Sequence, residues 1–194
     1  MKLGKLLLVA VSAAVLMGAL LVSTASARNR SISSQTWTSL WRRMDFAGGP
    51  GTIECEVKLS GSFHSRTITK TVNSLIGYIT EGTVLRCIRG SMTINQASLP
   101  WHLRYRAFGG TLPNITSYSD TLTGAELRLR EPLFGATCTV SNATWVRILV
   151  LSASVVSRTS QSGTNSCSGL TVTLSGEETN ITNGAGSRLT VTLI

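Results

Sequence analysis

Residues that carry most metal chemistry are scarce in this chain. Its 194 residues include two histidines, and only two of its nine acidic residues are aspartates. The histidines form no His-x-His or His-x-x-x-His motif, and two aspartates cannot build a calcium loop. The four cysteines include no Cys-x-x-Cys pair, which argues against a zinc site. We therefore expect neither a metal nor a cofactor.

Motifs for nucleophilic catalysis are equally scarce. No Gly-x-Ser-x-Gly elbow is present. His64 lies between two serines, and Asp45 or Asp120 could orient it, but a chain so rich in serine places one near any histidine by chance. We predict no catalytic residue. The alternative is a hydrolase that uses His64 or His102 with a serine or a carboxylate.

Glu54 and Glu56 are the one pair of acids with a spacing that suggests glycoside cleavage. Two residues apart on a strand, their Cα atoms lie about 6.5–7 Å from each other, which overlaps the carboxylate separation of glycosidases. Such pairs normally face each other across a cleft, whereas these two share a strand face with Lys58. A solvated outer face is the better interpretation.

The N-terminus has the layout of a secretory signal over residues 1–27. Two lysines precede an uncharged apolar run over residues 6–22, and Ala25 and Ala27 form the small-residue site that a signal peptidase requires. A retained membrane anchor is the alternative, since the run is long enough to span a bilayer. We expect cleavage after Ala27 and a secreted product with no membrane span.

The composition predicts anionic partners for this product. The chain has 18 Lys+Arg and 9 Asp+Glu. Two lysines leave with the signal, and arginine dominates the remaining cations. Because arginine grips carboxylate, sulfate or phosphate with a bidentate fork, we expect acidic cell-wall polymers, anionic glycans or membrane surfaces as partners. Nucleic acid is a less natural partner outside the cell, and the charge could also serve solubility alone.

All four cysteines lie in the mature part of the chain. Outside the cytoplasm, an even number of cysteines predicts disulfides, here two. Three connectivities are possible, and sequential pairing is the simplest: Cys55–Cys87 and Cys138–Cys167.

The mature chain reads as short strands separated by turns. Hydrophobic and polar residues alternate over 52–59, 101–107, 124–130 and 188–194, with Gly-rich turn signals between such segments. Residues 145–156 are apolar at both parities, which predicts a central strand buried on both faces. We predict a single all-β domain over residues 35–194, an antiparallel β-sandwich or a closed barrel, preceded by a signal helix and a flexible tail at 28–34.

One segment, residues 33–46, is ambiguous. Trp37, Leu40, Trp41 and Met44 have the i, i+3, i+4, i+7 spacing of a helical face. The content of Ser, Thr and aromatic residues, and the Gly-rich turn that would make a hairpin with residues 52–59, favour a strand.

Several peptides between Cys55 and Cys138 resemble a group of uncharacterised secreted proteins of high-G+C Gram-positive bacteria. They are GSFHS at 61–65, the Gly77-Tyr78 pair, LPWHLRY at 99–105, and Phe108 followed by GTLPNI at 110–115. Residues 56–60 depart from the threonine-and-glutamate form of that strand in the group. The resemblance implies a signal peptide, a β-rich domain and paired cysteines, and it assigns no activity.

The most suggestive constellation for binding is cationic. His102, Arg104 and Arg106 form one row on a strand face, and Arg128 and Arg130 form a second. If the two strands are neighbours, five donors would converge on one surface and could hold phosphate, sulfate or uronate groups. An aromatic platform for sugar rings would come from Tyr78, Tyr118 or Trp41. The plainer interpretation is that half-buried strands show their polar residues to water.

These observations favour a secreted, non-enzymatic binding or cell-surface-associated domain attracted to anionic polymers or glycans. The alternatives are the hydrolase described above and a purely structural component of the cell envelope.

Overall fold

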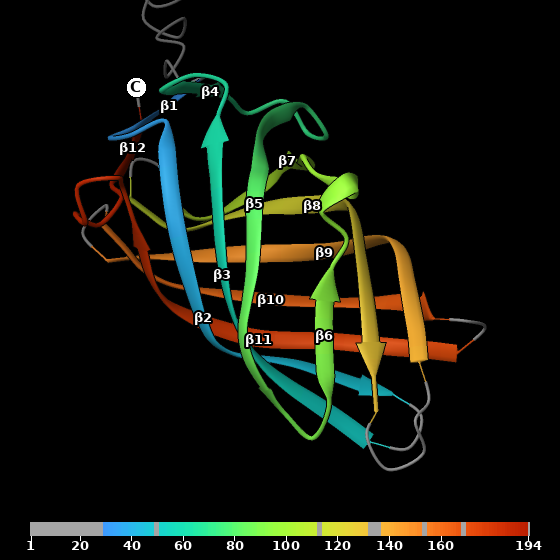
Figure 1. The fold of residues 1–194 in the computed structure, drawn as a ribbon. Helices are drawn as coiled ribbons and strands as arrows, with labels where there is room; N and C mark the ends of the chain where they lie inside the picture. Colours follow the sequence, from blue (N-terminus) through green and yellow to red (C-terminus); the bar gives the residue numbers. More distant parts are fainter. Residues whose placement is uncertain are drawn as a thin grey trace, which may run out of the picture.

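A computed structural model describes residues 29–48, 51–111, 114–131, 137–152, 155–167 and 170–193 (Figure 1). The predicted signal peptide, residues 1–27, lies outside the described residues. No helix within the described part of the chain is long and apolar enough to cross a membrane.

Eight long antiparallel strands form a closed barrel. Strands that follow one another along the chain are neighbours in the sheet, and the last long strand pairs with the first, which closes the ring. The closure selects the barrel over the sandwich among the two predicted architectures. In sheet order the strands are β8 (Asn114–Arg130), β7 (Trp101–Thr111), β5 (Leu75–Ile88), β3 (Gly51–Phe63), β2 (Thr36–Gly48), β11 (Leu170–Thr182), β10 (Val155–Cys167) and β9 (Thr137–Ser152), and β9 returns to β8.

A small three-stranded sheet covers one end of the barrel, the upper end in Figure 1. It consists of β1 (Asn29–Ile32) between β12 (Val191–Leu193) and β4 (Thr67–Thr69). We call this sheet the cap. Arg30 and Ile32 are buried in it. The expectation of a flexible tail at 28–34 is therefore wrong for residues 29–32, because hydrogen bonds to two strands and two buried side chains hold this segment.

β2 explains the helix-like spacing at residues 33–46. Trp37, Ser39 and Trp41 point inward in strand alternation, and Met44 and Phe46 resume it after a register shift relative to β3. The two arginines between Trp41 and Met44 are both exposed, as expected for a β-bulge, which inserts one residue and moves the inward pattern by one position. The prediction of a strand is confirmed, and the bulge explains why the inward residues of this strand have a helix-like spacing.

β9 differs from the prediction of a strand buried on both faces. Trp145, Arg147 and Leu149 point into the barrel, whereas Ile148 on the opposite parity is 39% exposed. A barrel wall has one interior face and no second layer outside it, so the outward apolar residues of this segment meet solvent.

The alternation predicted over 52–59, 101–107 and 124–130 is confirmed with one local exception. Over 188–194, Leu189 and Val191 are buried as predicted, and residue 194 lies outside the described residues. Residues 53, 55, 57 and 59 of β3 and 125, 127 and 129 of β8 point inward, and the charged residues between them point outward. In β7 the pattern holds from Trp101 to Tyr105 and then breaks, because a register shift leaves Ala107 exposed.

Both predicted disulfides are present, and they join neighbouring strands. Cys55 and Cys87 face each other across β3 and β5, and Cys138 and Cys167 join β9 to β10. Disulfides of this kind suggest an oxidising environment.

Candidate functional site

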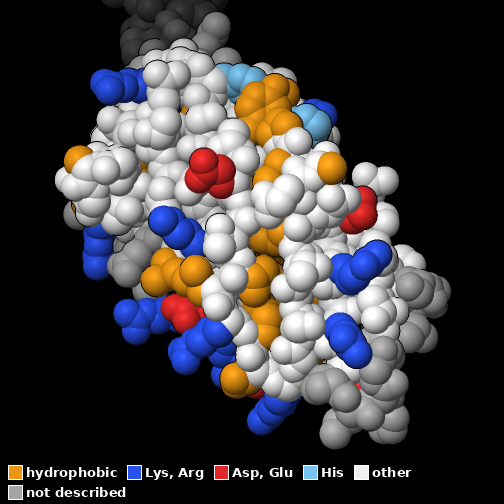
Figure 2. Space-filling view, viewed as in Figure 1, with side chains coloured by type: hydrophobic (Ala, Val, Ile, Leu, Met, Phe, Trp, Pro, Cys, Tyr) orange, Lys and Arg blue, Asp and Glu red, His pale blue; other side chains and the backbone are white. Residues whose placement is uncertain are grey.

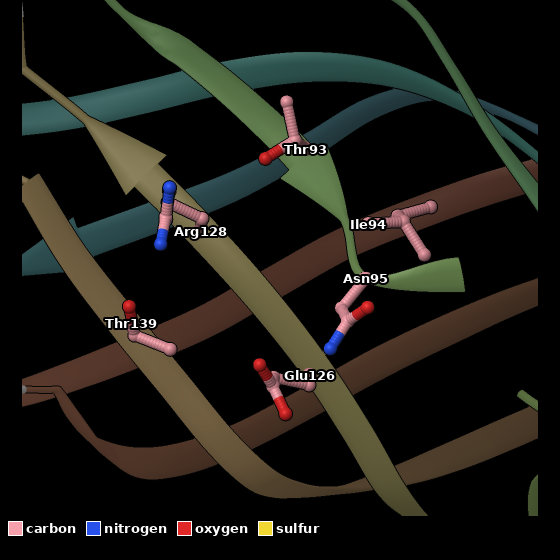
Figure 3. Close-up of a pocket in the computed structure, with 6 residues that line it drawn as sticks. All are labelled: Thr93, Ile94, Asn95, Glu126, Arg128 and Thr139. Atoms are coloured by element: carbon pink, nitrogen blue, oxygen red, sulfur yellow. The ribbon is translucent and has the colours of Figure 1, made fainter. Parts of the chain in front are cut away.

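The outer wall of the barrel carries a polar groove where β8 is flanked by β9 and by the short strand β6 (Ser91–Ile94). One hollow of about 320 Å³ is lined by residues of all three strands (Figure 3). A second, of about 390 Å³, shares Thr93 and Arg128 with the first. Together they form the outer groove, lined by Ser91, Thr93, Ile94, Asn95, Glu126, Arg128, Arg130, Thr137 and Thr139.

A glycine turn brings β6 against the end of β8. Arg89 and Gly90 both have positive φ, 60° and 151°, and reverse the chain between β5 and β6. A Cβ atom at Gly90 would lie 2.8 Å from the backbone oxygen of Arg130, so only glycine permits this approach. At the other end of β6, the Asn95 side-chain oxygen accepts from the Ala97 amide at 3.1 Å, which leaves the Asn95 amide group to face the groove.

Four exposed arginines elsewhere on the wall are ion-paired, whereas the arginines of the groove are not paired within the part of the chain that the structure describes. Each of the four lies within 3.6 Å of a carboxylate: Arg43 with Asp45 and Glu54, Arg86 with Glu56, Arg89 with Glu54, and Arg158 with Glu177. Among the residues that the structure describes, no acid lies within ion-pair distance of Arg128 or Arg130. Hydroxyl groups of Ser91, Thr93, Thr137 and Thr139 surround them instead.

The two predicted cationic rows lie on the same outer surface but do not converge. Arg104 on β7 is opposite Thr121 of β8, whereas Arg128 is opposite Thr93 of β6. Seven strand residues separate Thr121 from Arg128, or roughly 20 Å. Arg104 also donates to the backbone oxygen of Asn73 at 3.0 Å. The predicted site therefore divides into the outer groove, with Arg128 and Arg130, and a separate row on β7 that contains His102, Arg104 and Arg106.

His102 belongs to a row of three rings. His64 contacts Tyr78 edge to face, with ring centroids 4.9 Å apart, and the Tyr78 and His102 rings are 5.5 Å apart. In Figure 2 the two histidines flank an apolar patch near the top of the view. Neither histidine has a serine hydroxyl or a carboxylate as hydrogen-bond partner within the described ranges.

Of the three residues predicted to form an aromatic platform on the outer surface, only Tyr78 is partly exposed. Trp41 and Tyr118 are buried inside the barrel, at 0% and 1% exposure. Both stand at inward parity of their strands, which removes them from any outer sugar-binding surface.

The barrel interior contains a charged cluster that sequence reasoning missed. It consists of Arg30 from the cap, Asp120 of β8, Arg147 of β9 and Glu178 of β11, all at most 2% exposed. We call these four residues the interior tetrad. Asp120 and Arg147 are opposite each other in register, with Asp120 Oδ1 and Arg147 Nε 3.6 Å apart.

Aromatic rings hold the two guanidinium groups of the tetrad. The Arg30 guanidinium carbon lies 4.5 Å from the ring centre of Tyr105 and 4.1 Å from that of Tyr118. The Arg147 guanidinium lies over Trp37 at 4.6 Å. These cation–π contacts replace part of the hydration that both cations lose on burial.

Burial raises the pKa of both interior acids. It raises the pKa of Glu178 from 4.5 to about 8, although Arg147, the hydroxyls of Ser39 and Thr159 and the Leu40 backbone oppose this shift. Burial also raises the pKa of Asp120, against the opposing effect of Arg147 and Arg30. Desolvation dominates in both carboxyls because no solvent reaches them.

Strand parity is the signal that could have identified three members of the tetrad. Asp120 has the parity of Tyr118 and Leu122, Arg147 that of Trp145 and Leu149. Glu178 likewise follows Val172 and Leu174. A charged residue at an inward parity departs from the ordinary pattern, whereas Arg30 lies in the segment that was expected to be a tail.

The chain matches no family model, no curated protein and no solved structure. The resemblance to secreted proteins of high-G+C Gram-positive bacteria therefore stays a prediction.

Proposed function

We propose that this protein is an exported, non-enzymatic domain that binds anionic polysaccharides in the outer groove. The observation that carries the proposal is the pair Arg128 and Arg130, which face solvent together in a groove lined by hydroxyl groups, whereas four other exposed arginines of the wall are paired with acids. Cations without an internal counter-ion are available to an external one, and guanidinium groups match carboxylate and sulfate geometry.

The shape of the groove supports a polymer rather than a compact ligand. It follows the strands along the wall as two adjoining shallow hollows, and it exposes hydroxyl and amide groups beside its arginines (Figure 3). Serine, threonine and asparagine side chains bond sugar hydroxyls, while arginines bind the acidic substituents. Glu126 stands two residues from Arg128 and would disfavour very densely charged chains at that end of the groove.

Retention of the mature protein on immobilised polygalacturonate and heparin, with dextran as neutral control, tests this proposal across a salt series. We expect retention on the acidic polymers that weakens with salt. Arg128→Ala and Arg130→Ala should each weaken binding about tenfold, the cost of a lost charge-assisted hydrogen bond.

Arg86→Ala is the matched control, because it removes the same charge from an exposed, ion-paired arginine elsewhere on the wall. Arg104→Ala asks whether the separate β7 row contributes. Equal losses in Arg86→Ala and Arg128→Ala would show that net charge and not the groove governs binding. Retention on neither acidic polymer would remove the proposal.

A further inference from the structure

Many polar atoms of the barrel interior have no hydrogen bond of good geometry within the described residues, although Glu178 lies near the Ser39 and Thr159 hydroxyls and Asp120 lies near Tyr118 and Arg147. They come from β2, β8, β9, β10 and β11 and from the cap. Eight are nitrogen donors, five are oxygen acceptors and two are hydroxyls: Arg30 Nε and Nη2, Arg147 Nε and Nη1, Nε1 of Trp37, Trp41 and Trp145, Gln161 Nε2 and Oε1, both carboxyl oxygens of Asp120 and Glu178, Tyr118 Oη and Thr159 Oγ1.

These groups form one connected zone. Register places Tyr105 opposite Asp120, Asp120 opposite Arg147, and Arg147 opposite Gln161 across four successive strands. Beyond Gln161, Thr159 of β10 is opposite Glu178 of β11, and Glu178 is opposite Trp41 of β2. These residues form a continuous polar zone, which we call the polar belt, from β7 around to β2, just below the cap.

Such a zone is costly unless another molecule pairs with it. Each unsatisfied buried group costs about 1–3 kcal/mol, so the whole set would consume the net stability of an ordinary domain. Elsewhere the fold does satisfy its buried groups: the Trp101 indole donates to Ser98 Oγ at 2.9 Å. The unpaired atoms of the belt thus point to a bound polar molecule.

The balance of donors and charge defines its chemistry. Donor nitrogens outnumber acceptor oxygens, so the best partner is rich in acceptors. Glu178, faced by Arg147 and flanked by Ser39 and Thr159, is protonated in the lower part of the neutral range because burial raises its pKa to about 8. With Glu178 neutral, the two guanidiniums outnumber the one remaining acid, Asp120, so an external anion would bring the zone closer to charge balance. The rings of Trp37, Tyr105 and Tyr118 stack with the guanidiniums, and those of Trp41 and Trp145 lie in the same zone and suit a planar apolar body.

We propose that the barrel interior is a binding site for a small aromatic carboxylate, whose anionic group lies between Arg30 of the cap and Arg147 of the wall. The site is independent of the outer groove. Because Arg30 belongs to β1, the cap completes the site. The indole and amide N–H groups of the belt donate to the remaining acceptors of the ligand.

Tryptophan emission reports on this site directly, because all four tryptophans are at most 2% exposed inside the barrel. Titration of the mature protein with benzoate and phenylacetate should change the emission saturably, with a dissociation constant of about 1 mM or lower. Their neutral amides, benzamide and phenylacetamide, should bind at least about tenfold more weakly, because they lack the charge that the guanidiniums match. Calorimetry on the same samples separates binding from collisional quenching.

Three variants locate the site. Arg30→Gln, on the cap, should weaken benzoate about tenfold or more. Glu178→Gln keeps the neutral form of that side chain and should retain binding while removing the loss of affinity that deprotonation of Glu178 causes between about pH 7 and 9. Arg86→Ala, which removes an exposed, ion-paired arginine outside both sites, should leave benzoate binding unchanged.

Several results would overturn the proposal. They are no saturable response to either carboxylate, equal binding of acids and amides, or full affinity in a folded Arg30→Gln protein. If Arg30→Gln does not fold, as judged by near-UV circular dichroism, the acid–amide comparison and the pH profile of Glu178→Gln decide the question. A crystal structure with benzoate that shows only water in the belt would also overturn it.

Discussion

At the residue scale, the interior tetrad is the most costly feature of this protein. Removing a charged group from water costs several kcal/mol even after relaxation, and a buried ion pair repays this cost only with good geometry and full hydrogen bonding. Asp120 and Arg147, with atoms 3.6 Å apart, fall short of that geometry. Apolar residues at these positions would give a more stable barrel, so the tetrad is better explained by binding than by folding.

Glu178 should make the stability of the protein depend on pH. The folded protein holds a proton on Glu178 up to a pKa of about 8, whereas the unfolded chain releases it near the ordinary pKa of 4.5. The contribution of Glu178 to the free energy of unfolding is therefore fully present below pH 4.5. It is lost as the pH rises towards 8, because the unfolded state binds fewer protons than the folded state in this range. A shift of this size corresponds to roughly 4–5 kcal/mol over the window. The raised pKa of Asp120 acts in the same direction.

Urea unfolding of the wild-type and Glu178→Gln proteins across this pH range checks the prediction. Glu178→Gln should flatten the decline, since its amide cannot ionise. Glu81→Gln, at an exposed position of β5, is the control and should reproduce the wild-type profile. Identical slopes for the wild-type and Glu178→Gln proteins would assign the pH dependence to other groups.

At the element scale, the cap depends on a few inward contacts. β1 has four residues, and its two inward side chains are Arg30 and Ile32. Backbone bonds extend the pairing on both sides: Ile32 donates to the Arg66 oxygen at 2.8 Å and Ser33 to the Thr190 oxygen at 3.1 Å. A strand this short is not stable by itself, so its burial against the barrel end holds it in place.

Ile32→Ala should therefore loosen the cap. Ile32 is 3% exposed, and truncating a buried isoleucine to alanine costs about 2–4 kcal/mol. We expect faster amide exchange in β1 and β12 with little change in the strands of the barrel wall, measured by hydrogen–deuterium exchange. Ser31→Ala, on the opposite face of β1, should have little effect. Uniformly faster exchange across the barrel would show that the cap and the wall unfold as one unit.

At the scale of the whole molecule, ring closure leaves the upper part of the barrel wall without a free strand edge. The lower part differs, because β5 pairs with β7 only over Leu75–Ile79. Below that point β5 has β3 as its ladder partner, and Leu85 and Ile88 are 51% and 55% exposed. The disulfide Cys55–Cys87 joins β5 to β3 in this lower part. It thus fastens the part of the wall where the ladder has one side only.

Removing this disulfide should destabilise the protein by about 3–4 kcal/mol, the loop-closure entropy that a 32-residue crosslink removes from the unfolded chain. Comparison of denaturant midpoints for the wild type and a Cys55→Ser, Cys87→Ser protein measures the effect. The equivalent Cys138→Ser, Cys167→Ser protein, with a similar separation of 29, is the matched comparison. Loss of the first bond should increase amide exchange in the lower half of β5 specifically. Equal exchange there in both variants would contradict the fastening role.

The β class, the alternation of most strands and the simplest disulfide pairing were predictable from the sequence, because each depends on local chemistry. Period-two alternation follows from backbone geometry within one strand, and cysteine parity follows from composition. The same reasoning placed Arg128 and Arg130 on an outer face. Sequence reasoning could not show that the pairing of β7 with β8 stops short of Arg128 and Arg130.

Barrel closure, the cap and the interior tetrad arise from contacts between distant segments. β2 and β11 come from opposite ends of the domain, and their pairing converts a sheet into a ring with one inside. Alternation gives each strand two faces, but the ring decides that Asp120, Arg147 and Glu178 meet in one enclosed space and that Arg30 reaches them from the cap. Hydrogen-bond register across the sheet, which no single strand encodes, brings these charges together and keeps the two cationic rows apart.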